Sequence, residues 1–382
     1  MAVLLWLAGI YLRIPVLVAP PLAPFISDEL GLTQALTGAL TTLPILMLAI
    51  GSMPGSLAIS RIGPRNTLAL AMVIMVIGSA GRGLVPDTVT LMLASAVMGF
   101  GVAMMQPALP ALLPRWLEPH HLALGSAIYM NGMLMGEFIG AGITLPVLMP
   151  LLDHSWRATL LAWSLPALLV AGALFLPKRD RARPVRKVAW LPDWRNPLTV
   201  RIGLLLGLSG SLFFGLNAYM GSLLEQQGQF HKLADALFWY NIAQVFASLI
   251  MLKMARVWVG RRTVIIVTAT LSIIGTLGAI AFTGWWSIAS ATLMSLTAGI
   301  LLILLVAVPP LVTSSEETGR LSAGTFLVGY TMAFTIPMLG GLIADWTGDA
   351  RHAILTIVAY SVLVLPLAFT LNLKRKKDPP ES

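Results

Sequence analysis

The sequence predicts an all-α polytopic membrane protein, with twelve transmembrane helices arranged as two halves of six. Hydrophobic residues make up 57% of the 382 residues and charged residues only 11%, whereas about a quarter of the residues in soluble proteins are charged. Apolar runs long enough to cross a bilayer, which takes roughly 20 residues, recur along the whole chain. One long polar segment divides these runs into two nearly equal groups.

The twelve expected spans follow from the apolar runs and from the Pro, Gly and charged residues that interrupt them. The first six spans are expected at 3–26, 36–59, 67–84, 89–113, 122–150 and 157–176. The second six are expected at 200–223, 233–255, 263–282, 286–312, 321–343 and 353–372. The connections between them are short, so the chain has no room for a sizeable soluble domain.

The polar segment after the sixth span gives the domain organisation. We expect an N-terminal six-helix half at 1–177, a cytoplasmic linker at 178–199, and a C-terminal six-helix half with a short basic tail at 200–382. The bases of the linker are expected to set the topology and to contact anionic lipid. Two groups of six spans joined by a basic loop are typical of secondary transporters built from parallel halves.

The distribution of basic residues predicts the orientation. The net charge is +9, but the basic side chains lie at the ends of apolar runs and do not cluster on one surface. A nucleic-acid partner is therefore not expected. Twenty basic residues fall on connections assigned to the cytoplasm, and four fall outside: Arg82, Arg157, Lys232 and Arg351. Both termini are therefore expected in the cytoplasm, and we expect a multi-pass protein, monomeric, in the lipid bilayer of a bacterial inner (plasma) membrane.

Two charged residues are expected deep in the membrane. Arg13 lies in the middle of the first span and Glu137 lies in the fifth. An arginine at mid-bilayer costs at least about 2.5–3.5 kcal/mol, so Arg13 should face a wet cavity and bind something there. Its planar fork suits a carboxylate-like group. Glu137 is either a proton carrier or a fixed partner of Arg13, and a purely structural ion pair is the alternative.

The polar candidates in the second half are neutral. Asn241 and Gln244 share one face of the eighth span with Ser248, and Tyr240 lies beside them. The other substrate-binding candidates in this half are Asn217, Tyr219 and Tyr330. Each of these side chains is about equally suited to joining helices. The glycines of the fifth span, Gly132, Gly136 and Gly140, recur every fourth residue and predict a close helix-packing face.

The connection between spans two and three resembles the loop motif of the major facilitator superfamily. The matching residues are Gly55, Leu57, Ala58, Arg61, Gly63 and Arg65, with Ser60 where that motif usually has an acid. A counterpart in the second half consists of Arg256 and Gly260-Arg261-Arg262. The resemblance implies that Arg61, Arg65, Arg261 and Arg262 belong to gating loops that act as conformational latches through helix-end and charge contacts.

Further residues resemble the cyanate and 2-nitroimidazole transporter family. They are Arg13 with the prolines after it, Leu40-Thr41-Thr42-Leu43-Pro44, Gln106 with Pro110, Gly329-Tyr330, Ala333, Pro337, Gly341, Asp345, Thr347 and Gly348. The resemblance implies a twelve-helix transporter that works by alternating access on a small anionic or polar organic solute. It also makes Gln106 a substrate-binding candidate.

Several other functions are disfavoured. The chain has no cysteine, which excludes disulfides and thiolate chemistry, and all five histidines, His120, His121, His154, His231 and His352, fall on expected connections. No lysine follows a glycine, so the nucleotide-binding Gly-Lys-Ser/Thr pattern is absent. We therefore expect no metal, no cofactor and no enzymatic activity. The alternative functions are a proton-coupled multidrug efflux antiporter, with Glu137 as proton site and Arg13 structural, and, less favoured, an integral-membrane enzyme.

Overall fold

The computed structural model describes residues 1–176, 194–313, 315–371 and 373. The predicted linker lies outside the described residues except for its last six, and so do the basic residues predicted for the tail, Lys374 to Lys377. Within the described residues, twelve helical segments are long and apolar enough to cross a membrane. This number confirms the twelve spans predicted from the apolar runs.

The spans follow one another in the predicted order. The N-terminal half contains α1 (Ala2–Ile10), α2 (Ile14–Leu17), α3 (Ala19–Leu30), α4 (Gln34–Gly81), α5 (Thr88–Trp116), η1 (Pro119–His121), α6 (Leu122–Phe138), the π-helix η2 (Ile139–Leu148), α7 (Met149–Leu151), α8 (Trp156–Ser164) and α9 (Pro166–Ala173). The C-terminal half contains α10 (Pro197–Gln226), η3 (Phe230–Lys232), α11 (Leu233–Trp258), α12 (Arg262–Ala281), α13 (Trp285–Val306), α14 (Pro309–Val312), α15 (Ser315–Thr347), α16 (Arg351–Val364) and η4 (Leu365–Thr370).

Local chemistry explains where several of these helices begin and break. Thr33 and Asp87 cap α4 and α5, because their side chains accept hydrogen bonds from Leu36 N and Thr90 N. The predicted second and third spans form the single element α4, broken at Gly63, whose φ of 81° is open to glycine at little cost. The tenth span ends at Val306, six residues before its predicted end.

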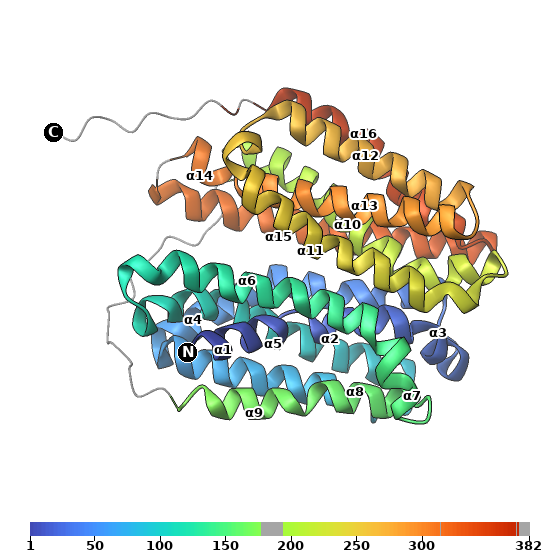
Figure 1. Cartoon of the computed structure of the whole chain (residues 1–382), viewed down its shortest axis with the longest axis horizontal. Helices are drawn as coiled ribbons and strands as arrows, with labels where there is room; N and C mark the ends of the chain where they lie inside the picture. Colours follow the sequence, from blue (N-terminus) through green and yellow to red (C-terminus); the bar gives the residue numbers. More distant parts are fainter. Residues whose placement is uncertain (177–193, 314, 372, 374–382) are drawn as a thin grey trace.

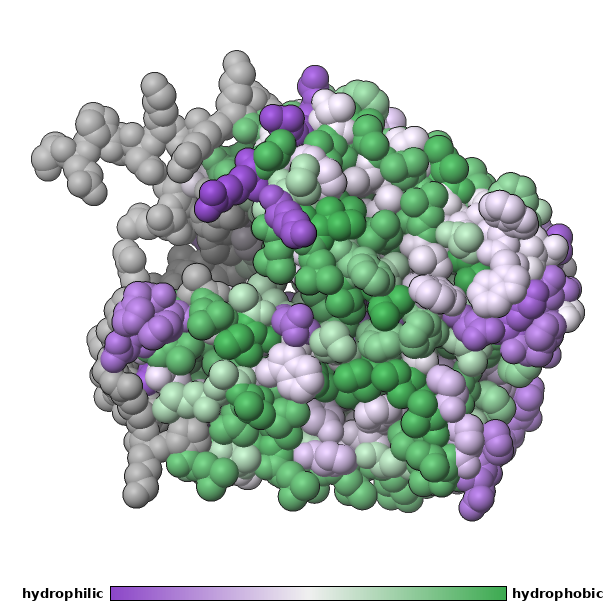
Figure 2. Space-filling model, viewed as in Figure 1, coloured by the Kyte–Doolittle hydropathy of each residue, from purple (hydrophilic) through white to green (hydrophobic). Residues whose placement is uncertain are grey.

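The two halves lie one above the other in Figure 1, with α1–α9 in blue and green and α10–α16 in yellow-green to red. We call the end where α9 finishes and α10 begins the linker end. The opposite end, where α3 meets α4 and α15 meets α16, is the distal end. Figure 2 shows a broad hydrophobic band across this face, with hydrophilic residues gathered toward the ends. This pattern fits a bundle that crosses a bilayer.

The glycine stripe of the fifth span packs as predicted. A Cβ atom added at Gly132 or Gly136 would collide with the backbone of the first span, at Trp6 and Ile10 respectively, and one at Gly140 would lie a tight 3.1 Å from the Ile14 carbonyl oxygen. The three glycines therefore let α6 and η2 approach α1 and α2 more closely than larger residues would allow. This close approach brings Glu137, the neighbour of Gly136, next to the middle of the first span.

We predict that Gly136→Ala destabilises the fold, because the new methyl group meets backbone atoms of Ile10 and α1 must move. Overpacking of this kind costs roughly 1–3 kcal/mol, and the thermal unfolding midpoint of the purified protein should fall. Gly172→Ala is the matched control, since a Cβ atom there would have nothing within 4 Å. Equal midpoints for the two variants would contradict the packing interpretation.

Candidate substrate site

A break in the first span presents Arg13. Helix α1 ends at Ile10 and α2 begins at Ile14, and Arg13 precedes α2 with a non-helical φ of −128° and ψ of −35°. Pro15 follows two residues later and has no N–H, so a continuous helix would lose a hydrogen bond here. Non-helical backbone at membrane depth is tolerated where it is buried in protein or borders a cavity.

Arg13 and Glu137 form an ion pair at this break. The Arg13 Nε atom lies 3.1 Å from Glu137 Oε1, and the two side chains are only 8% and 6% exposed. The angle does not meet hydrogen-bond geometry, so the enclosed Nε has no hydrogen-bond partner within the described ranges, although it is close to the carboxylate. We regard the contact as an ion pair, because distance rather than angle governs charge attraction. The structure thus brings the two predicted charges together.

The free edge of the Arg13 guanidinium is available for another contact. Nε is its only nitrogen that is both enclosed and without a hydrogen-bond partner, and no hydrogen bond joins either terminal nitrogen to a described residue. The terminal nitrogens can therefore donate to a further group. The guanidinium carbon lies 5.9 Å from the ring centre of Phe214 in α10, so a residue of the C-terminal half lies beside the guanidinium.

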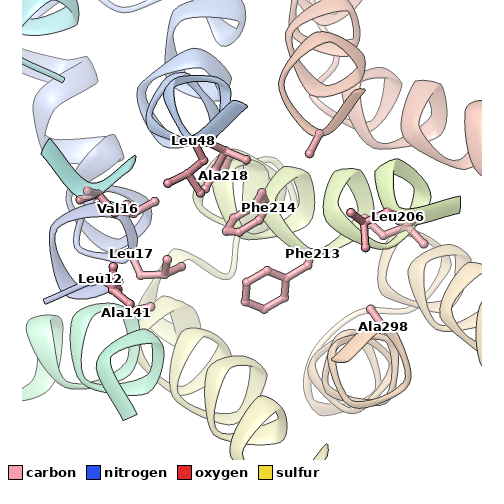
Figure 3. Packing of buried hydrophobic residues seen from close by; sticks show 14 of the residues in the cluster. Leu12, Val16, Leu17, Leu48, Ala141, Leu206, Phe213, Phe214, Ala218 and Ala298 are labelled. Carbon is pink, nitrogen blue, oxygen red and sulfur yellow. The ribbon is translucent and has the colours of Figure 1, made fainter. Parts of the chain in front are cut away.

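Aromatic side chains of the C-terminal half face the ion pair. Figure 3 shows Phe213 and Phe214 projecting from α10 between the two halves. Phe213 stacks on Tyr240 of α11 with ring centres 5.5 Å apart, and the Tyr240 hydroxyl donates to the Phe213 carbonyl at 2.8 Å. Phe213 in turn meets Phe214, the neighbour of Arg13, with ring centres 5.1 Å apart. The predicted residues Arg13, Glu137 and Tyr240 therefore belong to one cluster that spans both halves.

Two further predicted pairs are brought together. Asn217 Nδ2 donates to Asn241 Oδ1 at 3.0 Å, and both side chains are fully buried. Asn217 Oδ1 is enclosed and has no hydrogen-bond partner among the described residues. Gln106 Nε2 donates to the Tyr330 hydroxyl at 3.3 Å, which joins α5 to α15 across the two halves. Each pair places neutral donors and acceptors between helices.

Two other candidates are engaged elsewhere. Gln244 donates to the carbonyl and hydroxyl of Ser295 at 2.8 and 3.2 Å, so it joins α11 to α13 within one half. The Tyr219 hydroxyl donates to the Pro337 carbonyl at 2.8 Å and lies against Gly38 and Gly341, where an added Cβ atom would collide with it. The sequence left open whether these side chains bind substrate or join helices, and in the structure both make contacts that join helices.

Two of the predicted gating-loop arginines, Arg65 and Arg262, contact residues of their own halves. Arg65 Nε donates to the Leu174 carbonyl at 2.8 Å and its guanidinium lies 5.0 Å from the Phe175 ring centre. Arg262 donates to the Phe369 carbonyl at 3.0 Å. Arg61 and Arg261 are exposed. A latch role for these four residues stays a prediction.

Contacts between the two halves continue from the level of the ion pair to the distal end. Phe25 meets Phe230 with ring centres 6.3 Å apart, and Phe138 meets Phe238 at 5.2 Å. On the other side, the Asp345 carboxylate accepts backbone hydrogen bonds from Gln34 N at 2.5 Å and Ala35 N at 3.0 Å. These contacts all join one half to the other. The Asp345 carboxylate caps the N-terminus of α4, where a negative charge is favoured.

We predict that Asp345→Asn loosens the distal end. A lost charge-assisted contact of about 1–2 kcal/mol shifts the ratio of closed to open molecules roughly 5- to 30-fold. Because the chain has no cysteine, spin labels at Leu151→Cys and Arg351→Cys report the distance between the halves at this end. The fraction of long distances should rise.

Asp349→Asn is the matched control for this prediction, since Asp349 accepts from Arg351 N within its own half. Unchanged distances in the Asp345 variant would contradict a closing role for this carboxylate.

Sequence reasoning missed several residues. Phe213 and Phe214 carry no charge and were indistinguishable from ordinary apolar packing residues. Arg82, predicted in an external connection, is instead buried, with 1% of its surface exposed. Glu118, His120 and His121 lie close enough together to offer three metal-ligand atoms within 4.8 Å, but both histidines are exposed on η1. That exposed group supports no metal-site assignment.

Comparisons with known proteins agree with this architecture. The family model described as Major Facilitator Superfamily matches residues 5–234. The 2-nitroimidazole transporter of Escherichia coli (strain K12) is 27% identical over 92% of this chain and 90% of its own length. The cyanate transport protein CynX of the same strain is 26% identical over 96% of this chain and 97% of its own.

Among solved structures, a D-xylose-proton symporter has a TM-score of 0.76 at 14% identity, covering 96% of both chains. At that identity the likeness concerns the fold alone. It confirms the predicted arrangement of twelve helices in two six-helix halves.

Proposed function

Because the chain belongs to the major facilitator superfamily, we propose that it is a secondary active transporter that moves a small anionic or polar organic solute by alternating access. The Arg13 guanidinium binds the solute between the two halves, and Glu137 is the proton-coupling group. The observation that carries this proposal is the Arg13 guanidinium itself. It is held on one edge by Glu137 and has no hydrogen-bond partner on the other among the described residues.

The charge balance of the pair supports proton coupling. With Glu137 ionised, its charge cancels that of Arg13 and the site is neutral. A bound monoanion would then leave an uncompensated negative charge in a low-dielectric region, which is costly. One proton on Glu137 restores neutrality, so we propose that an anion and a proton enter the site together. Binding of the anion should therefore strengthen as the pH falls.

Neutral groups complete the proposed site. Gln106 with Tyr330, and Asn217 with Asn241, offer hydrogen bonds to the polar part of the solute, while Phe213, Phe214 and Tyr240 offer flat apolar contact. Ligand sites commonly combine such apolar walls with a few polar groups. The relatives named for transport of 2-nitroimidazole and of cyanate support a solute that is small and electron-rich.

The arrangement in the membrane belongs to the proposal as well. We place the halves at 1–177 and 200–382, with the linker at 178–199 and both termini in the cytoplasm of a bacterial cell. The linker end then faces the cytoplasm and the closed distal end faces outward. Rocking of one half against the other would expose the Arg13 site alternately to the two sides.

A ligand panel tests the proposed function. The purified protein is heated in the presence of cyanate, formate, acetate, benzoate, 2-nitroimidazole or lipophilic cations, because a ligand of the native state raises its apparent stability. A stabilising anion or nitroheterocycle, with stronger stabilisation at lower pH for the anion, supports the proposal. Stabilisation by lipophilic cations alone would favour a drug exporter and contradict it.

A further inference from the structure

Arg82 is a buried cation that the proposed transport cycle does not use. It follows the last residue of α4, and only 1% of its surface is exposed. No carboxylate of the described residues lies within ion-pair distance of it. Its Nε is enclosed and finds no hydrogen-bond partner in the part of the chain that the structure describes. Burying an arginine without an acid is costly, so its remaining contacts should explain its presence.

Those contacts lead to the break in the first span. One terminal nitrogen of Arg82 donates to the Pro15 carbonyl at 2.6 Å and to the Ser79 hydroxyl at 3.2 Å. The Ser164 hydroxyl lies 2.7 Å from that of Ser79, so α8 supports α4 at this point. Pro15 belongs to α2, two residues after Arg13. A chain of polar contacts therefore runs from α8 through α4 to the segment that carries Arg13.

We propose that Arg82 is a positioning residue that fixes the broken segment of the first span, so that Arg13 meets Glu137 and the face of Phe214. The inference rests on the proposed role of Arg13. Helix α2 has only four residues and cannot hold its own geometry, because short helices gain little from their internal hydrogen bonds. A charge-assisted bond to its carbonyl is roughly twice as strong as a neutral one.

The test measures amide hydrogen exchange of residues 11–17 in the full-length protein, without any ligand. Arg82→Met should speed exchange in this segment at least tenfold, while α5 and α13 keep their protection. Arg82→Lys should restore much of the protection, because an ammonium group can still donate to the Pro15 carbonyl. Ser164→Ala keeps Arg82 and removes only the hydrogen bond between Ser164 and Ser79, so it should give a smaller increase in the exchange of residues 11–17. This variant replaces Arg82→Met if Arg82→Met folds poorly.

Arg65→Met is the matched control, since Arg65 also donates to a backbone carbonyl of this half, that of Leu174, at 2.8 Å. It should leave exchange of residues 11–17 unchanged. Unchanged exchange in Arg82→Met, or a uniform increase throughout the protein, would overturn the positioning role and leave the proposed function intact. A local increase combined with normal transport by Arg13→Gln would instead overturn the proposed function and leave the positioning contact in place.

Discussion

Arg13→Gln should abolish transport. Removing one partner from a buried, charged contact costs about 2–5 kcal/mol, so affinity for an anionic solute should fall roughly 30-fold or more. Arg13→Lys keeps the positive charge but loses the planar fork, and should retain partial activity with a weakened apparent affinity. Uptake into proteoliposomes, with the solute that the ligand panel identifies, measures both effects.

The Arg13→Gln variant also leaves Glu137 without its counter-charge, and breaking a buried pair in this way is itself destabilising. The double variant Arg13→Gln with Glu137→Gln removes both charges and controls for that effect. It should fold at least as well as the single variant and still fail to bind the anion. Normal uptake by the double variant would show that the Arg13 charge is not needed for the solute.

Glu137→Gln should separate solute movement from proton movement. The variant keeps the Arg13 charge and can no longer exchange a proton at position 137. The site then carries a net positive charge, so anion binding should become tighter and lose its dependence on pH. Accumulation of solute driven by a proton gradient should disappear, whereas exchange of labelled for unlabelled solute across the membrane should continue.

The Glu137→Gln prediction is checked by measuring gradient-driven uptake and equilibrium exchange of solute in the same proteoliposomes. Gly172→Ala is a suitable reference variant, since its added methyl group contacts nothing. If Glu137→Gln still accumulates solute against a gradient, Glu137 is a structural partner of Arg13 and the proton is carried elsewhere.

The sequence predicts the architecture well because spans are read from local hydropathy. It also singles out Arg13 and Glu137, since a charge within an apolar run is costly. Their pairing was one of two options, and the glycine stripe that brings α6 against α1 explains why pairing occurs. Only the nearby prolines indicated a break in the first span. Its exact place at residues 11–13 depends on contacts from other helices, which the sequence does not show.

Long-range contacts account for what the sequence did not predict. Arg82 stands at the end of an apolar run between two glycines, where an arginine normally reaches the membrane surface. Its actual partner, Pro15, is 67 residues away in the chain. Phe214 likewise becomes part of the site only through the apposition of the two halves. The spacing of Gln244 from Asn241 on one helix face did not reveal that the Gln244 side chain would donate a hydrogen bond to Ser295 of α13.

The central claim is that the side chain at position 13 meets water-borne solute between the halves. Arg13→Cys introduces the only thiol in a chain without cysteine, and its reaction with a positively charged methanethiosulfonate can be followed by mass spectrometry. If position 13 borders a water-filled path between the halves, this thiol should react. Ala8→Cys, at a fully buried position of α1, should stay unmodified. A thiol at position 13 that remains as unreactive as the one at position 8 would contradict the account.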